Sequence, residues 1–354
     1  MYRRCLLISL VLAIASGCER REEPHDDRVH RLTGRVLATG DYLDQPGHMT
    51  VAGGRLLVLD RTAPMIHVFG LSDGKRLGSF GQKGDGPGEF RSTRDVQVDV
   101  RNPRDVWIYD MSLLRMTRVR VGQGPLPEFQ ELVKLHNGGG VYLHPAWLTD
   151  TTLAVSAIAP MYPQGRLLLT RRTGEVIRTI GQTPRHPDAA SIPTTVLQHA
   201  YESYVTVRPD RARFATATRQ ADRLEIYRAD GTQLAQVAGS TGFLPVFEVN
   251  QRAEGVSMAL GAEVRAGYVD LESNDDRIYA LFSGVRMGDD PQQAFFGREV
   301  HVFDWDGTLL ARLKLDAPAL TIAVAPDEKQ MFAIRHDPEP SVVRYDLPQP
   351  LPGG

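Results

Sequence analysis

The chain has little cysteine, and this scarcity limits how the fold can be stabilised. Its 354 residues include two cysteines, Cys5 and Cys18. Cys5 lies in an N-terminal apolar run that we expect to be removed, so the mature chain keeps one thiol and cannot form an intramolecular disulfide. We therefore expect stability to come from packing, for which a hydrophobic content of 42% is ample.

The sequence also lacks an excess of charge of one sign. Lys and Arg number 41 against 43 Asp and Glu, the net charge is -2, and the two signs are interspersed. There is no basic field to hold a nucleic-acid backbone, so nucleic acid is not expected as a partner. Long runs with helical period are missing after the first 20 residues, whereas Gly (33) and Pro (23) are abundant. This composition is typical of a protein built from many turns.

The N-terminus reads as an export signal. Arg3-Arg4 is followed by an apolar run from Cys5 to Ala15, which is too short to span a bilayer. Ala15-Ser-Gly-Cys18 resembles the lipobox of bacterial lipoproteins, which implies cleavage before Cys18 and diacylation, for example with palmitate, of that cysteine. The family pattern more often has Leu where this chain has Ala15. The alternative is an ordinary secretory signal cut after Ala13-Ile-Ala15.

The segment after the signal predicts where the protein resides. By resemblance to proteobacterial sorting rules, Glu19 rather than Asp after the cysteine favours the outer membrane, with the protein facing the periplasm or the surface. The alternative reading gives a secreted or periplasmic soluble protein. We predict a lipoprotein signal peptide over residues 1–17, a flexible tether over 18–28, one folded unit over 29–347 and a disordered tail over 348–354.

The rest of the chain repeats a unit of short strands. Four hairpins of one kind are marked by the turns Asp73-Gly74, Thr173-Gly174, Asp230-Gly231 and Asp306-Gly307. A further pair of strands precedes each unit, and six such pairs are found. Their first strands are Met49–Val51, Asp95–Asp99, Pro145–Leu148, Ser203–Val207, Gly267–Asp270 and Leu320–Val324. This repetition predicts an all-β six-bladed β-propeller of four-stranded antiparallel blades.

Two places need more than the simple repeat. The last unit lacks a fourth strand, and the unassigned run Val29–Leu37 would supply it beside Val342, so an N-terminal strand is expected to close the ring in the last blade. In the second unit, Gly122–Phe129 is interpreted as an outer hairpin loop, with Phe129–Leu135 as the fourth strand. The competing interpretation is a three-stranded blade.

At these residues the chain resembles bacterial six-bladed propellers of the TolB-like and NHL-repeat groups. The resemblance rests on the glycine-rich Phe80–Phe90 before a Val-x-Val-Asp strand, on Val106-Trp-Ile-Tyr-Asp110 and on Val302–Gly307. It covers about residues 29 to 347. It implies a propeller that is often a lipoprotein of unassigned function, and it carries no catalytic residues to transfer.

Long connections gather on one end of such a ring, where binding is expected. Connections from second to third strands and from fourth strands to the next first strand share this loop face. They carry aromatic and charged residues, which also suit packing against the ring. The candidate binding residues are Tyr162, His199, Tyr201, Arg286, Asp289, Asp290, Phe295 and Phe296.

Catalytic and metal-binding signatures are not found. Nothing resembles a His-Glu-x-x-His motif, a Cys/His cluster or a nucleophile elbow. Asp99, Asp270 and Asn274 could contribute to a channel metal site, but each also suits a turn or a strand end. No cofactor is predicted, and a calcium ion in the channel is left open.

The expected function is therefore that of a lipid-anchored binding or scaffolding module at the cell envelope. Its partners would be the membrane, through Cys18, and a protein or small ligand at the loop face. The alternative is an envelope hydrolase or lyase with a divalent metal in the propeller channel. The identity of the ligand, any activity and the oligomeric state are not predictable from the sequence.

Overall fold

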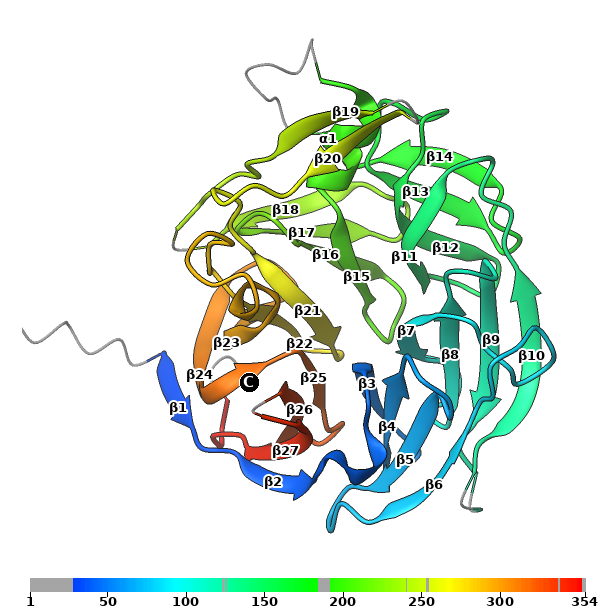
Figure 1. Ribbon diagram of the computed structural model, residues 1–354, viewed down its shortest axis with the longest axis vertical. Helices are drawn as coiled ribbons and strands as arrows, with labels where there is room; N and C mark the ends of the chain where they lie inside the picture. Colours follow the sequence, from blue (N-terminus) through cyan, green and yellow to red (C-terminus); the bar gives the residue numbers. More distant parts are fainter. Residues whose placement is uncertain are drawn as a thin grey trace, which may run out of the picture.

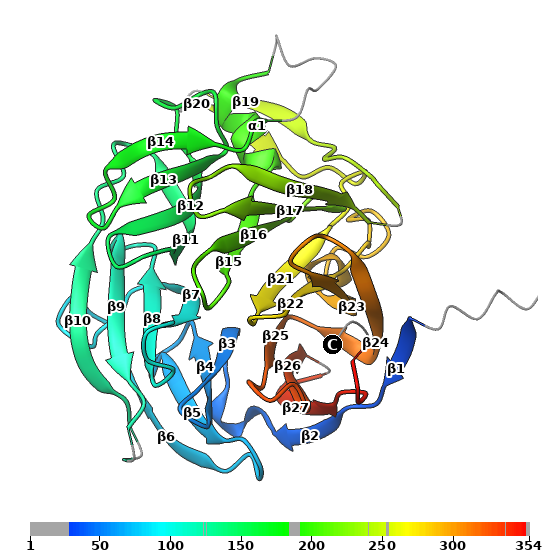
Figure 2. The same ribbon diagram turned by 180° about the vertical axis from the view of Figure 1, so that it is seen from behind.

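The computed structural model describes residues 28–351 except 123, 125, 184–191, 240, 253–254 and 337. Six of the seven sheets that these residues form are blades arranged as a ring around a central axis, seen from its two ends in Figures 1 and 2, and the seventh is a two-stranded hairpin. The six-bladed propeller prediction is thereby confirmed. The predicted signal peptide, Cys18 and residues 18–27 of the predicted tether lie outside the described residues.

Each blade is built from four consecutive strands, except that the sixth takes its fourth strand from the N-terminus. Blade one contains β3 (Pro46–Ala52), β4 (Arg55–Asp60), β5 (Ile66–Gly70) and β6 (Arg76–Phe80); blade two contains β7 (Thr93–Val98), β8 (Asp105–Asp110), β9 (Arg115–Arg120) and β10 (Glu128–Lys134). Blade three contains β11 (Val141–Trp147), β12 (Thr152–Ile158), β13 (Leu167–Arg171) and β14 (Val176–Ile180); blade four contains β15 (Ser203–Val207), β16 (Arg213–Thr218), β17 (Arg223–Arg228) and β18 (Gln233–Ala238). Blade five contains β21 (Tyr268–Ser273), β22 (Arg277–Phe282), β23 (Gly297–Asp304) and β24 (Leu309–Ala319); blade six contains β25 (Thr321–Val324), β26 (Gln330–His336), β27 (Pro340–Asp346) and β2 (Arg35–Ala38).

The core lies between the blades. Second strands such as β4 and β8 are buried along nearly their whole length, whereas the outer strands β14 and β18 are largely exposed. A second strand is covered on both faces by its neighbouring blades, which is why it reads as a continuous apolar run such as Leu56-Leu-Val-Leu59. The ring is closed by the same packing, because Phe69 of blade one lies in one apolar cluster with Phe332 of blade six.

The N-terminal run closes the ring, but as two strands rather than one. β2 pairs antiparallel with β27, with Val36 opposite Val343, as the closure prediction requires. The preceding strand β1 (Val29–Leu32) instead pairs in parallel with β24 at the outer edge of blade five. The break falls at Gly34, where a Cβ atom would lie 2.4 Å from the Val343 side chain. The N-terminal run therefore joins blades five and six.

The turn glycines of the outer hairpins pack against the preceding blade. Gly74 has φ +65°, and a Cβ there would lie 2.2 Å from the carbonyl oxygen of Leu37 in β2. Gly231 has φ +83°, and a Cβ there would lie 2.6 Å from Ile180 in β14. Both the left-handed backbone and the close approach require glycine. Since β2 receives Gly74 as β14 receives Gly231, β2 acts as the outer strand of blade six.

The remaining predictions on the strands have mixed outcomes. β10 is the fourth strand of blade two, so the four-stranded interpretation of this blade is confirmed. The predicted disordered tail includes residues 348–351, whereas Leu351 is buried in an apolar cluster and its carbonyl accepts a hydrogen bond from Arg277. Residues 352–354 lie outside the described part of the chain.

The loop face carries the irregular elements. They are η1 (Gly40–Tyr42), α1 (Thr194–Ala200), the hairpin of β19 (Glu248–Arg252) and β20 (Gly255–Ala259), and η2 (Gln293–Phe295). α1 lies between blades three and four and contacts β20, which belongs to the connection between blades four and five. Among the described residues, no helix has the length and apolar character needed to cross a membrane.

Candidate functional site

The inner strands bring titratable side chains together on the ring axis. A cavity of about 40 Å³ is lined by His48 of β3, Asp95 of β7, His144 of β11, Tyr204 of β15 and the β21 carboxylates. The two β21 carboxylates are Asp270 and Glu272. Consecutive blades contribute these groups, so only closure of the ring brings them into one place.

One half of this axial cluster is a dense set of ion pairs around Glu202. His144 bridges two carboxylates, with Nδ1 3.0 Å from Asp95 Oδ1 and Nε2 3.1 Å from Glu202 Oε1. Arg94 and Arg219 approach Glu202 at 2.6 and 3.0 Å. Burial alone would raise the pKa of Glu202, but Arg219, His144 and Arg94 hold it well below its usual range. Glu202 is therefore a permanent anion shared by two arginines.

The titration of His144 follows from the same contacts. Burial works to lower the pKa of His144, but the charge of Asp95 and the hydrogen bonds to Asp95 and Glu202 raise it overall. The pKa of Asp95 is lowered: burial opposes this change, and His144 and His48 outweigh it. These contacts thus favour the protonated form of His144, an imidazolium that lies between the carboxylates of Asp95 and Glu202.

The other half of the axial cluster is poorly paired. His48 lies 3.9 Å from Asp95 and 3.7 Å from Asp270, beyond hydrogen-bond distance, and burial lowers its pKa. Asp270 accepts hydrogen bonds from Thr321 and from the backbone N–H of Ile322. Burial, reinforced by the charge of Asp270, raises the pKa of the Glu272 carboxyl well above its usual value.

The axial cluster can carry protons, but among the described residues it includes no activated nucleophile. No serine, threonine or cysteine is hydrogen-bonded to His48 or His144 in the described part of the chain. Within the same residues, no group of three or more His, Cys, Asp or Glu side chains is arranged to hold a metal ion. The three residues considered for a channel metal site do not lie together. Asp270 lies on the axis, Asp99 pairs with Arg101, and Asn274 donates a hydrogen bond to Glu328.

A second cavity, of about 190 Å³, lies on the loop face between blades four and five, and we call it the loop-face pocket. Its floor is buried and includes Val264, Tyr268 and Ala294, whereas Leu260 and Phe295 at its rim are 45% and 43% exposed. Apolar residues dominate its walls, and Arg219, Gln220 and His199 supply polar groups. A concave apolar site with a few polar groups is the usual form of a ligand pocket.

The structure brings together two of the eight predicted binding residues, since His199 and Phe295 both line the loop-face pocket. Arg286 lies close to it and pairs with Glu263, and Asp290 accepts hydrogen bonds from the backbone N–H groups that open η2. Asp289 donates its backbone N–H to Arg286. These residues shape the loop that supplies the rim.

The other predicted residues pack against the ring. Phe296 contacts His336 edge-on, Tyr162 packs against the apolar cluster of blades two and three, and Tyr201 is 1% exposed. The sequence analysis missed Arg219, Gln220, Met258 and Met287. Met258 and Met287 lie in the long connections that the repeat had singled out, and Arg219 and Gln220 directly follow the second strand of blade four. The position of these residues in the repeat could therefore have identified them as pocket residues, whereas their residue types could not.

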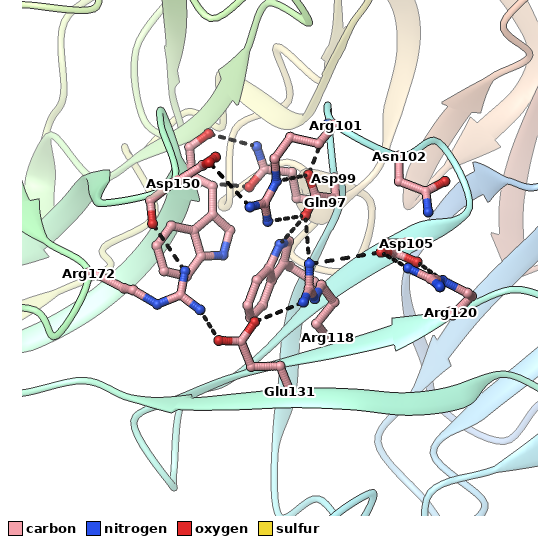
Figure 3. A network of polar contacts seen from close by, with 12 residues as sticks. Gln97, Asp99, Arg101, Asn102, Asp105, Arg118, Arg120, Glu131, Asp150 and Arg172 are labelled. Carbon is pink, nitrogen blue, oxygen red and sulfur yellow. Dashed lines mark hydrogen bonds and ion pairs between the residues drawn. The ribbon is translucent and has the colours of Figure 1, made fainter.

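The opposite face carries a network of arginines and carboxylates around two tryptophans (Figure 3). Asp99 accepts hydrogen bonds from Arg101 and from Nε1 of Trp107, and the rings of Trp107 and Trp147 lie 4.8 Å apart. Asp150 pairs with Arg101 at 3.4 Å and with Arg211 at 2.7 Å. The network joins turns of blades two, three and four, and its charges are largely paired. We interpret it as an inter-blade fastening.

Six antiparallel blades around a charged axis, with one face of short turns and one of long connections, define a six-bladed β-propeller. The chain belongs to the family described as TolB-like 6-blade propeller-like, whose model matches residues 29–327. This match confirms the predicted resemblance to the TolB-like group. No curated protein matches the chain.

A solved structure shares the fold. Raptor from Chaetomium thermophilum superposes with a TM-score of 0.50 at 12% sequence identity, over 91% of this chain and 29% of the Raptor chain. The chain thus spans less than a third of that protein's length. At this identity the likeness concerns the fold alone.

Proposed function

We propose that this propeller is a binding module of the cell envelope, anchored through lipid on Cys18 and recognising its partner at the loop face. The predicted export signal and the membership of the TolB-like family support the location. The observation that carries the binding role is the loop-face pocket, which is assembled from four separate connections: α1, the β16–β17 turn, the region of the β19–β20 hairpin, and the η2 loop.

The distribution of chain length supports this choice of face. The turns within blades on the opposite face are short, and the charged residues that line its cavity, such as Asp99, Arg101 and Asp150, are engaged in the arginine–carboxylate network. The loop-face pocket instead presents exposed apolar side chains at its rim. Exposed apolar groups around a cavity are typical of interaction sites. The rival function, a metal-dependent hydrolase or lyase, would need a metal site, and the described residues contain no group of three or more His, Cys, Asp or Glu side chains arranged as one.

In-cell photo-crosslinking followed by membrane fractionation tests both parts of the proposal. A photo-crosslinking amino acid is placed at Phe295, on the rim of the loop-face pocket, in the full-length chain with and without Cys18→Ala. The protein with Cys18 should fractionate with membranes and form a defined crosslinked product. Cys18→Ala should release it from the membrane, because a single lipidated residue is its anchor.

The matched control places the same crosslinker at Arg104, an exposed residue of a turn on the opposite face. Crosslinks of equal yield from Arg104 and Phe295, or none from Phe295, would contradict recognition at the loop face. Retention of the Cys18→Ala protein in the membrane fraction would contradict the anchor.

A further inference from the structure

The loop-face pocket combines an apolar cavity with an unsatisfied polar end. We propose that it binds the carboxy-terminal residue of a peptide, with an apolar side chain in the cavity and the free α-carboxylate at Arg219. This inference rests on the proposed binding role of the loop face and names the chemistry of its ligand.

The size of the cavity favours a single side chain. At about 190 Å³ it exceeds the roughly 150 Å³ that accommodates benzene in an engineered protein cavity. It is smaller than the roughly 300 Å³ at which pockets for drug-sized ligands begin. A leucine, methionine or phenylalanine side chain fits this range, whereas a nucleotide or a flavin does not.

The walls are suited to apolar side chains of varied shape. Met258 and Met287 line the cavity from different connections, and Leu260 and Phe295 complete the rim. Methionine is unbranched and polarisable, so it adapts to ligands that differ in outline. We therefore expect a preference for apolar over charged terminal residues rather than for one residue type.

The polar end supplies a cation. Arg219 reaches Glu202 through Nη1 at 3.0 Å, and Arg94 reaches the same carboxylate at 2.6 Å. Two guanidinium groups thus face one carboxylate here, and each guanidinium has five N–H donors in a fork that matches a carboxylate. Arg219 therefore retains donors and positive charge for an incoming carboxylate.

The side chain of Gln220 offers a hydrogen-bond acceptor that a peptide can use and a fatty acid cannot. Its Oε1 atom is buried and has no hydrogen-bond partner in the described part of the chain. A buried acceptor left unpaired costs free energy that a ligand donor can recover. The amide N–H of a terminal peptide residue is such a donor, and a fatty acid has none.

The experiment measures fluorescence anisotropy with the full mature protein in lipid nanodiscs. The probe is a fluorescein-labelled Gly-Ser-Gly-Ala-Leu peptide with a free carboxylate, and its carboxamide form and an Asp-terminated form are compared. The free carboxylate should bind at least tenfold more tightly than either. Decanoate serves as the fatty-acid arm and should not displace the peptide at matched concentration.

Two variants localise the binding. Met287→Trp should fill the cavity and weaken binding at least tenfold, and its matched control is Met161→Trp, at a residue 75% exposed outside the pocket. Gln220→Leu should weaken binding while leaving the melting temperature unchanged or raised, because no protein hydrogen bond to its Oε1 is lost. If Met287→Trp fails to fold, Gln220→Leu decides.

Three results with the wild-type protein would overturn the inference: equal binding of carboxylate and carboxamide peptides, no binding of any peptide, or displacement by decanoate. Unchanged affinity in Gln220→Leu would also overturn it. The crosslink at Phe295 is independent of these outcomes. A crosslink that persists without peptide binding would preserve the proposed function and reject only this ligand.

Discussion

Asp99 is a buried carboxylate whose charge is balanced by its neighbours. Its oxygens accept hydrogen bonds from the backbone and side chain of Arg101 and from Trp107. Burial would raise the pKa of Asp99, but these bonds lower it from 3.8 to about 2. The unfolded chain therefore takes up a proton more readily than the folded one. The resulting stability is present above about pH 4 and is lost as the pH falls towards 2.

Asp99→Asn should remove this contribution. We expect the variant to be less stable than the wild type by about 2 kcal/mol at pH 7, with the difference shrinking between pH 4 and pH 2. Urea unfolding at pH 7, 4, 3 and 2 measures it. Asp150→Asn is the control, because this partner in the network is 53% exposed and should change stability little. A constant difference between wild type and Asp99→Asn at every pH would contradict the assignment.

At the scale of elements, the two strands of the N-terminal run, β1 and β2, pair with different blades and contribute differently to stability. β2 completes blade six and receives the Gly74 turn of blade one, so it lies at the joint of the ring. β1 adds a parallel fifth strand to blade five, at an edge that is already paired on its inner side. Loss of β2 should therefore cost much more stability than loss of β1.

Soluble forms that begin at residues 28, 34 and 39 separate the two contributions. The form starting at 34 lacks β1 and should melt a few degrees below the form starting at 28. The form starting at 39 lacks both strands and should melt more than about 10 °C lower, or without a cooperative transition, because the ring is left open. Differential scanning calorimetry distinguishes these cases. Equal melting of the forms starting at 28 and 39 would refute closure by β2.

The sequence predicted the strands well where the pattern is local. Alternation and turn glycines such as Gly231 and Gly307 mark hairpins within about 20 residues, so the blades could be counted. The split of the N-terminal run was not predictable in this way. Its partners, β24 and β27, lie some 280 to 310 residues further along the chain, and its break is set by packing of Gly34 against Val343.

At the scale of the whole molecule, the axial cluster shows what local patterns cannot predict. His48, Asp95, His144 and Asp270 each stand in an ordinary strand, and none has a neighbour in sequence that signals a site. They meet because six first strands converge on one axis. Asp270 drew attention as a channel residue, but its partners could not be named until the register of every blade was known.

The axis also predicts a test in which two neighbouring carboxyls respond in opposite ways. The backbone of Glu272 pairs with Tyr279, but its carboxyl has no hydrogen bond in the described part of the chain, and burial and the charge of Asp270 raise its pKa well above 4.5. Above pH 4.5 the folded state therefore holds a proton that the unfolded chain releases, so stability falls as the pH rises. Glu272→Gln should remove this penalty and raise the melting temperature by a few degrees at pH 8, with a smaller gain at pH 5.

Asp270→Asn should instead lower the melting temperature, because Asp270 accepts hydrogen bonds from Thr321 and Ile322 that join blades five and six. A lower melting temperature for Glu272→Gln at pH 8 would show that the carboxylate is ionised and stabilised on the axis.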